Sequence, residues 1–297
     1  MAVSGSTDFS LNRNEILYKA LSLVGVKEEN LTPSAYEVSQ ASDWLNLMLK
    51  SWMSDDTHLW IRTTGTIFLE KAKQSYNMGT GTYAARGTIS ATTTDAAEAA
   101  IQTVISVTST TGFVNADNIG ILLDDDSIHW TTIVSFVADD TVTITTAIPS
   151  VAASGNAIYV YTNVAHRPMR VHEMMLRSPD GTDTEIYQIS QQEYWQQSTK
   201  SSPGQPTEYQ YDPQLGDGVL NTWPVMNANG YKLVYKYDKP FDDLDIGKDD
   251  LEFPIEWALA IIYNLAIDLG NEHSIDEEKY NRVMRRANFL LTKAKEF

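Results

Sequence analysis

The 297-residue sequence contains no cysteine. Disulfides, thiolate metal sites and cysteine nucleophiles are therefore excluded, and any metal site would have to use histidine and carboxylate ligands. The sequence also lacks an apolar run approaching the roughly 18 residues of a transmembrane helix, and its first ten residues do not have the layout of a secretory signal. We therefore expect a soluble protein made in a cytoplasm, with no membrane partner.

Motifs typical of enzymes are missing as well. The five histidines form no HxH or HExxH spacing, and no G-x-S-x-G nucleophile elbow occurs. The Gly79-Thr80-Gly81 segment lacks the third glycine and the following helix of a dinucleotide-phosphate loop. We expect no catalytic residue, no cofactor and no metal ligand, and we predict that the protein is not an enzyme.

Positive charge is scarce: 22 Lys and Arg stand against 39 Asp and Glu, which gives a net charge of -17. Binding to phosphates requires clustered Lys and Arg, so the chain as a whole is not expected to hold DNA tightly. An acidic protein can nevertheless surround DNA, because a wall without cations lets a duplex slide past.

The scarcity is extreme between residues 87 and 165, which contain no Lys or Arg and eight Asp or Glu residues. Short runs of alternating apolar and polar residues, such as Ile105 with Val107 and Ile158 with Val160, predict β-strands. We interpret residues 82–165 as a small acidic all-β barrel or sandwich domain, inserted into the rest of the chain.

Helices are predicted at both ends of the sequence. Asn12 caps the first, over 12–24, and Gly25 ends it; Thr32 caps the second, which runs to about residue 53. In the second helix Val38, Ala41, Leu45, Met48 and Trp52 form one apolar stripe, and Trp44, Leu47 and Leu49 widen the apolar surface beyond it. So much apolar circumference indicates a helix with neighbours on more than one side, in its own subunit or in an adjacent one.

Near the other end, Pro254 begins a helix that ends before Gly270 and carries Trp257. The last helix, 275–295, holds the one concentration of cations, with Arg282, Arg286 and Lys293 near a single helical line and Arg285 beside it. A charged stripe is often only a solvated face, but here it can also dock an acidic partner.

Three strands at 208–212, 219–223 and 231–237 are separated by turn signals and predict an antiparallel meander. The fold class is therefore α+β. We expect a helical bundle made by the N- and C-terminal helices, an antiparallel β region and the inserted domain. The corresponding segments are 1–81 and 166–297 for the core and 82–165 for the insertion.

Two acidic clusters leave calcium binding open. One is the loop with Asp243, Asp245, Asp249 and Asp250, where Gly247 stands one position too early for an EF-hand. The favoured alternative is a solvated loop whose carboxylates stabilise the helix that begins at Pro254. The other cluster, 124–126, is interpreted as a turn at a strand end.

The aromatic residues of the meander also allow two interpretations, a platform for stacking bases or sugars and ordinary strand packing, of which packing is favoured. They are Tyr209, Tyr211, Trp223, Tyr231, Tyr235 and Tyr237.

The order of several segments resembles the head-to-tail adaptors of short-tailed bacteriophages, also called packaged-DNA stabilisation or tail tubular A proteins. The segments are ILYKALSLVGVKEENLTPSAYEVSQASDWLNLMLKSWMSDDTHLW, RPMRVHEMMLR, ISQQEYWQQSTKSSPGQPTEY and FPIEWALAIIYNLAIDLG. The resemblance covers about two thirds of the chain, and residues 82–165 depart from the compact family pattern.

The resemblance implies a structural virion protein without enzymatic activity, located at the head-tail junction and assembled in the host bacterial cytoplasm. It implies a ring of about twelve copies that docks under the portal protein, retains packaged DNA, lets it pass without sequence-specific binding, and carries the tail nozzle, tail tube or fibre proteins. Carried onto this sequence, it makes Arg282, Arg285, Arg286 and Lys293 the portal-docking candidates. The candidates for contacts between copies are Trp44, Leu47, Trp52 and Trp257.

The alternative is a binding module at the virion surface, in which the inserted β domain contacts a carbohydrate or receptor or anchors a tail fibre.

Overall fold

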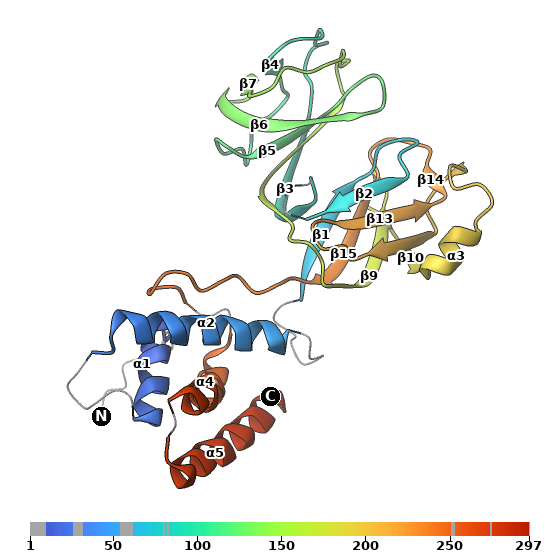
Figure 1. The fold of residues 1–297 in the computed structure, drawn as a ribbon. Helices are drawn as coiled ribbons and strands as arrows, with labels where there is room; N and C mark the ends of the chain where they lie inside the picture. The colour runs from blue at the N-terminus through green and yellow to red at the C-terminus, as the bar shows by residue number, and fades with distance from the viewer. Residues whose placement is uncertain are drawn as a thin grey trace, which may run out of the picture. The chain divides into compact units, whose positions relative to one another are not determined.

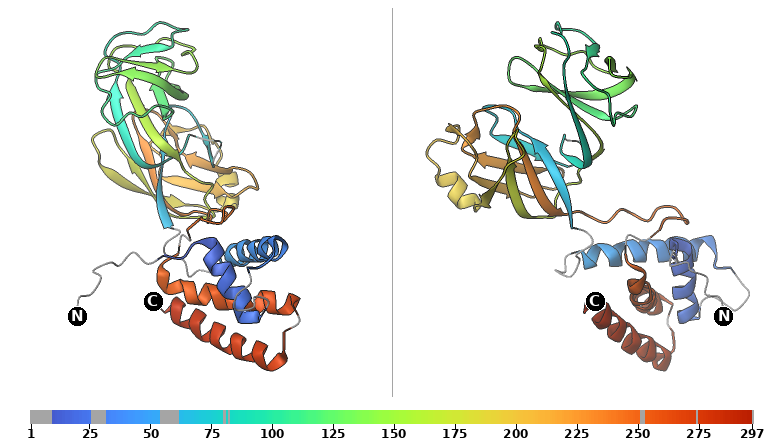
Figure 2. Two further views of the ribbon diagram at one scale, coloured as in Figure 1. Left: turned by 90° about the vertical axis from the view of Figure 1, so that its left-hand side faces the viewer. Right: turned by 180° about the vertical axis from the view of Figure 1, so that it is seen from behind.

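The computed structural model describes residues 10–25, 32–53, 62–79, 81, 83–250, 253–273 and 275–296. Parts of the N-terminal adaptor-like motif (26–31 and 54–60) lie outside these ranges, as do Thr80 and Thr82 near the predicted start of the insertion. The chain divides into two compact units, Met1–Ile61 with Pro240–Phe297 and Arg62–Lys239, which we call the helical unit and the β unit (Figures 1 and 2).

The helical unit joins the two ends of the chain. Its elements are α1 (Arg13–Val24), α2 (Ala35–Trp52), the 3-10 helix η2 (Ile255–Trp257), α4 (Ala258–Glu272) and α5 (Glu277–Lys295). Helix α4 contacts the other three α-helices and supplies much of the core, including Ile261 and Leu265, which are completely buried. The N- and C-terminal segments therefore share one hydrophobic core.

Capping explains where these helices begin. The predicted cap of α1 is confirmed: Asn12 and Glu15 form a reciprocal capping box, and Gly25 ends the helix with a φ of 84°. Thr32 as the cap of α2 is wrong, because Ser34 caps it together with Glu37, which stands three residues further on.

Gly270 does not end α4, contrary to the prediction, since the helix continues to Glu272. Gly270 is buried where the chain turns into α5, and a Cβ there would lie 3.0 Å from Ile275 Cδ1. This glycine therefore serves close packing rather than helix termination.

The β unit contains one 13-stranded sheet, a two-stranded sheet and the short helix α3 (Gln191–Gln196). Its strands are β1 (Arg62–Phe68), β2 (Ser75–Met78), β3 (Ala85–Thr93), β4 (Val104–Ser106), β5 (Asn118–Leu122), β6 (Ile128–Val137), β7 (Thr141–Ile144), β8 (Ala157–Val164), β9 (Arg170–Arg177), β10 (Asp183–Gln188), β11 (Pro203–Gly204), β12 (Glu208–Asp212), β13 (Gly218–Trp223), β14 (Val225–Met226) and β15 (Lys232–Asp238).

The order in the large sheet is β2-β13-β12-β10-β9-β15-β1-β3-β8-β5-β6-β7-β4. All neighbours in it are antiparallel except β10 and β12. The chain is therefore of mixed α and β structure, with five α-helices in its described part and a mostly antiparallel sheet.

The predicted meander is correct for β12 and β13, which pair from Glu208↔Trp223 to Asp212↔Val219. It is wrong for β15, which pairs with β1 and β9 instead. The turn signal at 227–230 marks where the chain reverses, but turn residues do not determine which strand the chain joins next.

The segment predicted as an insertion has a hydrophobic cluster of its own, which includes Ile105, Ile119 and Ile158. However, β3 continues the sheet from β1 through the pairs Gly65↔Arg86 and Thr66↔Ala85. The segment thus lies within the β unit, and its description as a separate barrel or sandwich stays a prediction.

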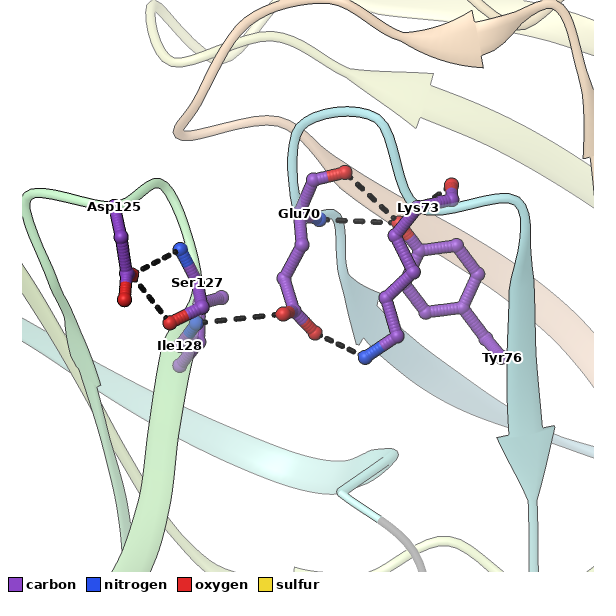
Figure 3. Close-up of polar contacts among 6 residues, drawn as sticks. All are labelled: Glu70, Lys73, Tyr76, Asp125, Ser127 and Ile128. Atoms are coloured by element: carbon purple, nitrogen blue, oxygen red, sulfur yellow. Dashed lines mark hydrogen bonds and ion pairs between the residues drawn. The ribbon is translucent and has the colours of Figure 1, made fainter. Parts of the chain in front are cut away.

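Two contacts join residues 82–165 to the segment that follows β1. Glu70, after β1, accepts a hydrogen bond from Ile128 N of β6 at 3.4 Å and forms an ion pair with Lys73 (Figure 3). The adjacent turn is held by Lys71, whose Nζ lies 2.8 Å from Asp126 Oδ2.

Candidate interaction surfaces of the helical unit

A groove lies between α2 and α4 on the helical unit. It has a volume of about 420 Å³, and Trp44, Leu47 and Trp52 line it from α2. Leu47 is 61% exposed and Trp44 is 38% exposed, while Trp52 is half-buried. From α4, Ile267 and Asp268 complete this lining. Three of the four candidates for contacts between copies are thus brought together.

Trp44 is held at the edge of this groove by a polar contact, because its Nε1 donates a hydrogen bond to Glu272 Oε2 at 2.9 Å. Burial raises the pKa of the Asp268 carboxyl above its ordinary value. The groove therefore combines exposed apolar surface with the carboxylates of Glu272 and Asp268, of which Asp268 is already partly removed from water.

Trp257, the fourth candidate, lies elsewhere. It is 1% exposed; its ring packs edge-on against Trp52 at a centroid distance of 6.0 Å and at a tilt against Phe253 at 5.8 Å. The wide apolar pattern near Pro254 reflects a helix buried at the centre of its own unit. We therefore remove Trp257 from the candidates for contacts between copies.

The basic residues of α5 form an exposed face. Arg282, Arg285, Arg286 and Lys293 are all exposed, and none makes an ion pair with a described residue. The opposite side of the helix buries Val283, Ala287 and Ala294. The predicted separation of a basic and an apolar side is confirmed.

Phe289 lies on this basic face and was not among the predicted residues. It is 57% exposed, and the Arg286 guanidinium lies 5.4 Å from its ring centroid. The sequence contained the signal, since Phe289 follows Arg286 by three residues and precedes Lys293 by four, on the same helical line. The face thus offers an exposed ring among unpaired cations.

The acidic loop stabilises the beginning of α1. Asp249 O accepts from Arg13 N at 2.9 Å and Gly247 O accepts from Asn14 N at 3.2 Å, so backbone carbonyls of the loop satisfy the first turn of α1. Of its carboxylates, Asp243 pairs with Lys50 at 2.5 Å. The contact with α1 was not predicted from the sequence, and the effect of the carboxylates on the helix at Pro254 stays a prediction.

The cluster at 124–126 is a turn between β5 and β6, as predicted. Its carboxylates have separate partners: Asp124 accepts from Ala153 N, Asp125 from Ser127 N, and Asp126 pairs with Lys71. Within the described ranges, no group of three or more His, Asp and Glu side chains is placed to share a metal ion.

The aromatic platform proposed for the meander is not formed. Tyr209, Tyr211, Tyr235 and Tyr237 are at most 9% exposed and belong to the core of the β unit, which confirms the strand-packing interpretation for them. Burial raises the pKa of the Tyr235 hydroxyl well above its ordinary value. In the part of the chain that the structure covers, no helix combines the length and apolar character of a membrane span.

Comparisons with known proteins add little. No family model matches the chain, and no curated protein matches it. Among solved structures, VP17, a capsid protein of bacteriophage P23-77, aligns with 60% of this chain and 72% of its own, at 12% identity and a TM-score of 0.12. A likeness this low supports no statement about fold or function.

Proposed function

We propose that this chain is a structural protein of a bacteriophage virion and forms the ring-shaped head-to-tail adaptor that docks under the portal. The proposal rests on the adaptor-like order of sequence segments and, above all, on the uncovered groove of the helical unit. Leu47 and Trp44 remain exposed although this unit already has a complete core of its own. An apolar surface of this kind is typical of a site for another protein.

In the proposed ring, a neighbouring copy covers the α2 and α4 groove, and the basic face of α5 meets acidic groups of the portal. The four cations make no ion pair within the described chain, so their charge is available to acidic groups of another protein. The acidic remainder of the chain would line or surround the DNA path without holding the duplex. Tail nozzle, tube or fibre proteins would attach on the side away from the portal.

The test is to mix the purified chain with the portal protein of the phage that encodes it, and to examine the product by negative-stain electron microscopy and sedimentation velocity. The wild-type chain is expected to form rings on the portal. Leu47→Glu should prevent rings, because it places a charge in the groove. The matched control is Leu215→Glu, at a leucine of the β unit that is fully exposed.

Docking is tested separately. The triple variant Arg282→Glu, Arg286→Glu and Lys293→Glu should lose portal binding while its circular dichroism stays that of the wild type. The charge-preserving triple Arg282→Lys, Arg286→Lys and Lys293→Arg should still bind. A wild-type chain that neither forms rings nor binds the portal would overturn the proposal.

A further inference from the structure

The β unit contains a small open pocket between the segment that follows β1 and the start of β6. Its volume is about 240 Å³, and its lining includes Glu70, Lys73, Asn77, Tyr83 and Trp130. Pockets for drug-sized ligands are usually about 300–1,000 Å³, so this one fits a single ring. None of its residues belongs to the surfaces assigned above to the portal or to neighbouring copies.

An aromatic platform forms one wall of the pocket. Tyr83 is 50% exposed, and its ring stacks on Trp130 with a centroid distance of 5.1 Å and an angle of 8°. Trp130 is fixed by Phe68 at 5.2 Å and by the edge of Tyr161 at 5.7 Å. Gly120 leaves room for this arrangement, because a Cβ there would lie 2.5 Å from the Trp130 ring. The platform is therefore rigid before any ligand arrives.

Polar groups on the other wall are held in place by neighbours. Tyr76 Oη accepts a hydrogen bond from Glu70 N at 3.0 Å and donates one to Glu70 O at 3.2 Å. As Figure 3 shows, the Glu70 carboxylate then lies between Lys73 Nζ and Ile128 N.

These polar groups keep spare hydrogen-bonding capacity. A carboxylate has about four acceptor positions and an ammonium has three donors, so Glu70 and Lys73 can both bind a further partner. The side-chain amide of Asn77, which is exposed, makes no hydrogen bond with a described residue. The pocket thus presents both donors and acceptors at the edge of an aromatic ring.

We infer that this pocket binds the terminal ring of a neutral carbohydrate. A pyranose has one face of C–H groups that can lie on Tyr83 and a rim of hydroxyls that can both accept from Lys73 or Asn77 and donate to Glu70. The ion pair of Glu70 with Lys73 leaves no net positive charge for an anionic sugar or a phosphate. Residues 87–165, from which Trp130 comes, add only negative charge.

The inference does not depend on the adaptor role, and it is tested on the whole chain because Glu70, Lys73 and Asn77 precede the segment 82–165. The probes are methyl α-D-glucopyranoside, methyl α-D-mannopyranoside, methyl β-D-galactopyranoside and N-acetyl-D-glucosamine, observed by saturation-transfer difference NMR. At least one should bind. Tyr83→Ala should weaken that binding at least about tenfold, and Asn77→Ala about threefold or more.

The matched control is Tyr187→Ala, which removes another exposed tyrosine, 62% accessible, from β10 of the same unit. It should leave sugar binding unchanged. The circular dichroism of each variant shows that it is folded. The inference is overturned if no probe binds the folded wild-type chain at millimolar concentration, if binding survives Tyr83→Ala, or if only an anionic probe such as adenosine monophosphate or N-acetylneuraminic acid binds.

Discussion

In the helical unit Trp44 and Leu47 stay 38% and 61% exposed, whereas in the β unit Tyr235 and Tyr237 are 1% and 0% exposed. Both sets were candidates for binding surfaces on the basis of sequence. The sequence patterns of the two sets carry different information. A helix needs only one apolar stripe to pack against its own unit, so apolar residues outside that stripe exceed what one chain requires. A strand with one buried face needs apolar residues at alternate positions, and Tyr235 and Tyr237 occupy such positions in β15, so they carry no such excess.

The largest effect that sharpens this comparison is expected from two tryptophans of the helical unit. Trp257→Ala should lower the free energy of unfolding by about 3–5 kcal/mol, because it leaves a cavity beside Trp52 and Phe253. Trp44→Ala should cost about 1 kcal/mol or less, since this side chain is partly exposed and makes one hydrogen bond. Urea titration followed by circular dichroism at 222 nm measures both. Equal losses would mean that Trp44 is as much a core residue as Trp257.

A smaller effect separates two buried tyrosines of the β unit. Tyr211 Oη donates to Pro168 O at 2.5 Å, whereas Tyr235 Oη is buried and makes no hydrogen bond with any described residue. Tyr211→Phe should therefore lower the free energy of unfolding by about 1 kcal/mol. Tyr235→Phe should leave it unchanged or raise it, because the variant removes an unsatisfied buried hydroxyl.

Urea unfolding of the two variants under identical conditions decides between these outcomes. A loss of stability in Tyr235→Phe as large as that in Tyr211→Phe would show that the Tyr235 hydroxyl has a partner in solution, such as a buried water molecule.

Much of the helical unit could be predicted from sequence because its signals are local. The Asn12 and Glu15 capping box, Gly25 with its positive φ, and the apolar stripes of α1 and α5 each depend on residues within a few positions. What was missed depends on packing between elements. Gly270 packs against Ile275 and Tyr280 of the next helical segment, and the acidic loop satisfies the first turn of α1, which lies more than 230 residues earlier.

The same reason limits what could be predicted of the β unit. Individual strands followed from alternation, but the pairing of β15 with β1 and β9 joins segments far apart in the chain. The pocket beside Tyr83 was not predicted, because Glu70, Tyr83 and Trp130 come from three separate segments and share no motif. Exposure of Leu47 also had to come from the structure, since the sequence shows only that the apolar arc is wide.

The smallest expected effect concerns acidic side chains, which the two units also treat differently. In the β unit, the Arg177 guanidinium holds the pKa of the Asp183 carboxyl below its ordinary value. In the groove, burial raises the pKa of Asp268 above 3.8. Asp268 thus has a higher pKa in the folded state than in the unfolded state, and at pH values between the two the folded state binds more protons. The contribution of Asp268 to stability is therefore greatest below the unfolded-state pKa and is lost as the pH rises through the folded-state pKa.

Asp268→Asn removes this titration. The variant should be more stable than the wild type at pH 7 by less than about 1 kcal/mol, because the carboxyl is only half-buried. The gain should shrink as the pH falls toward 4. Urea unfolding at several pH values measures the difference.

If a neighbouring copy covers the groove, it removes Asp268 further from water and raises the pKa of Asp268 again. Ring formation should therefore strengthen as the pH is lowered, and this pH dependence should be absent from Asp268→Asn.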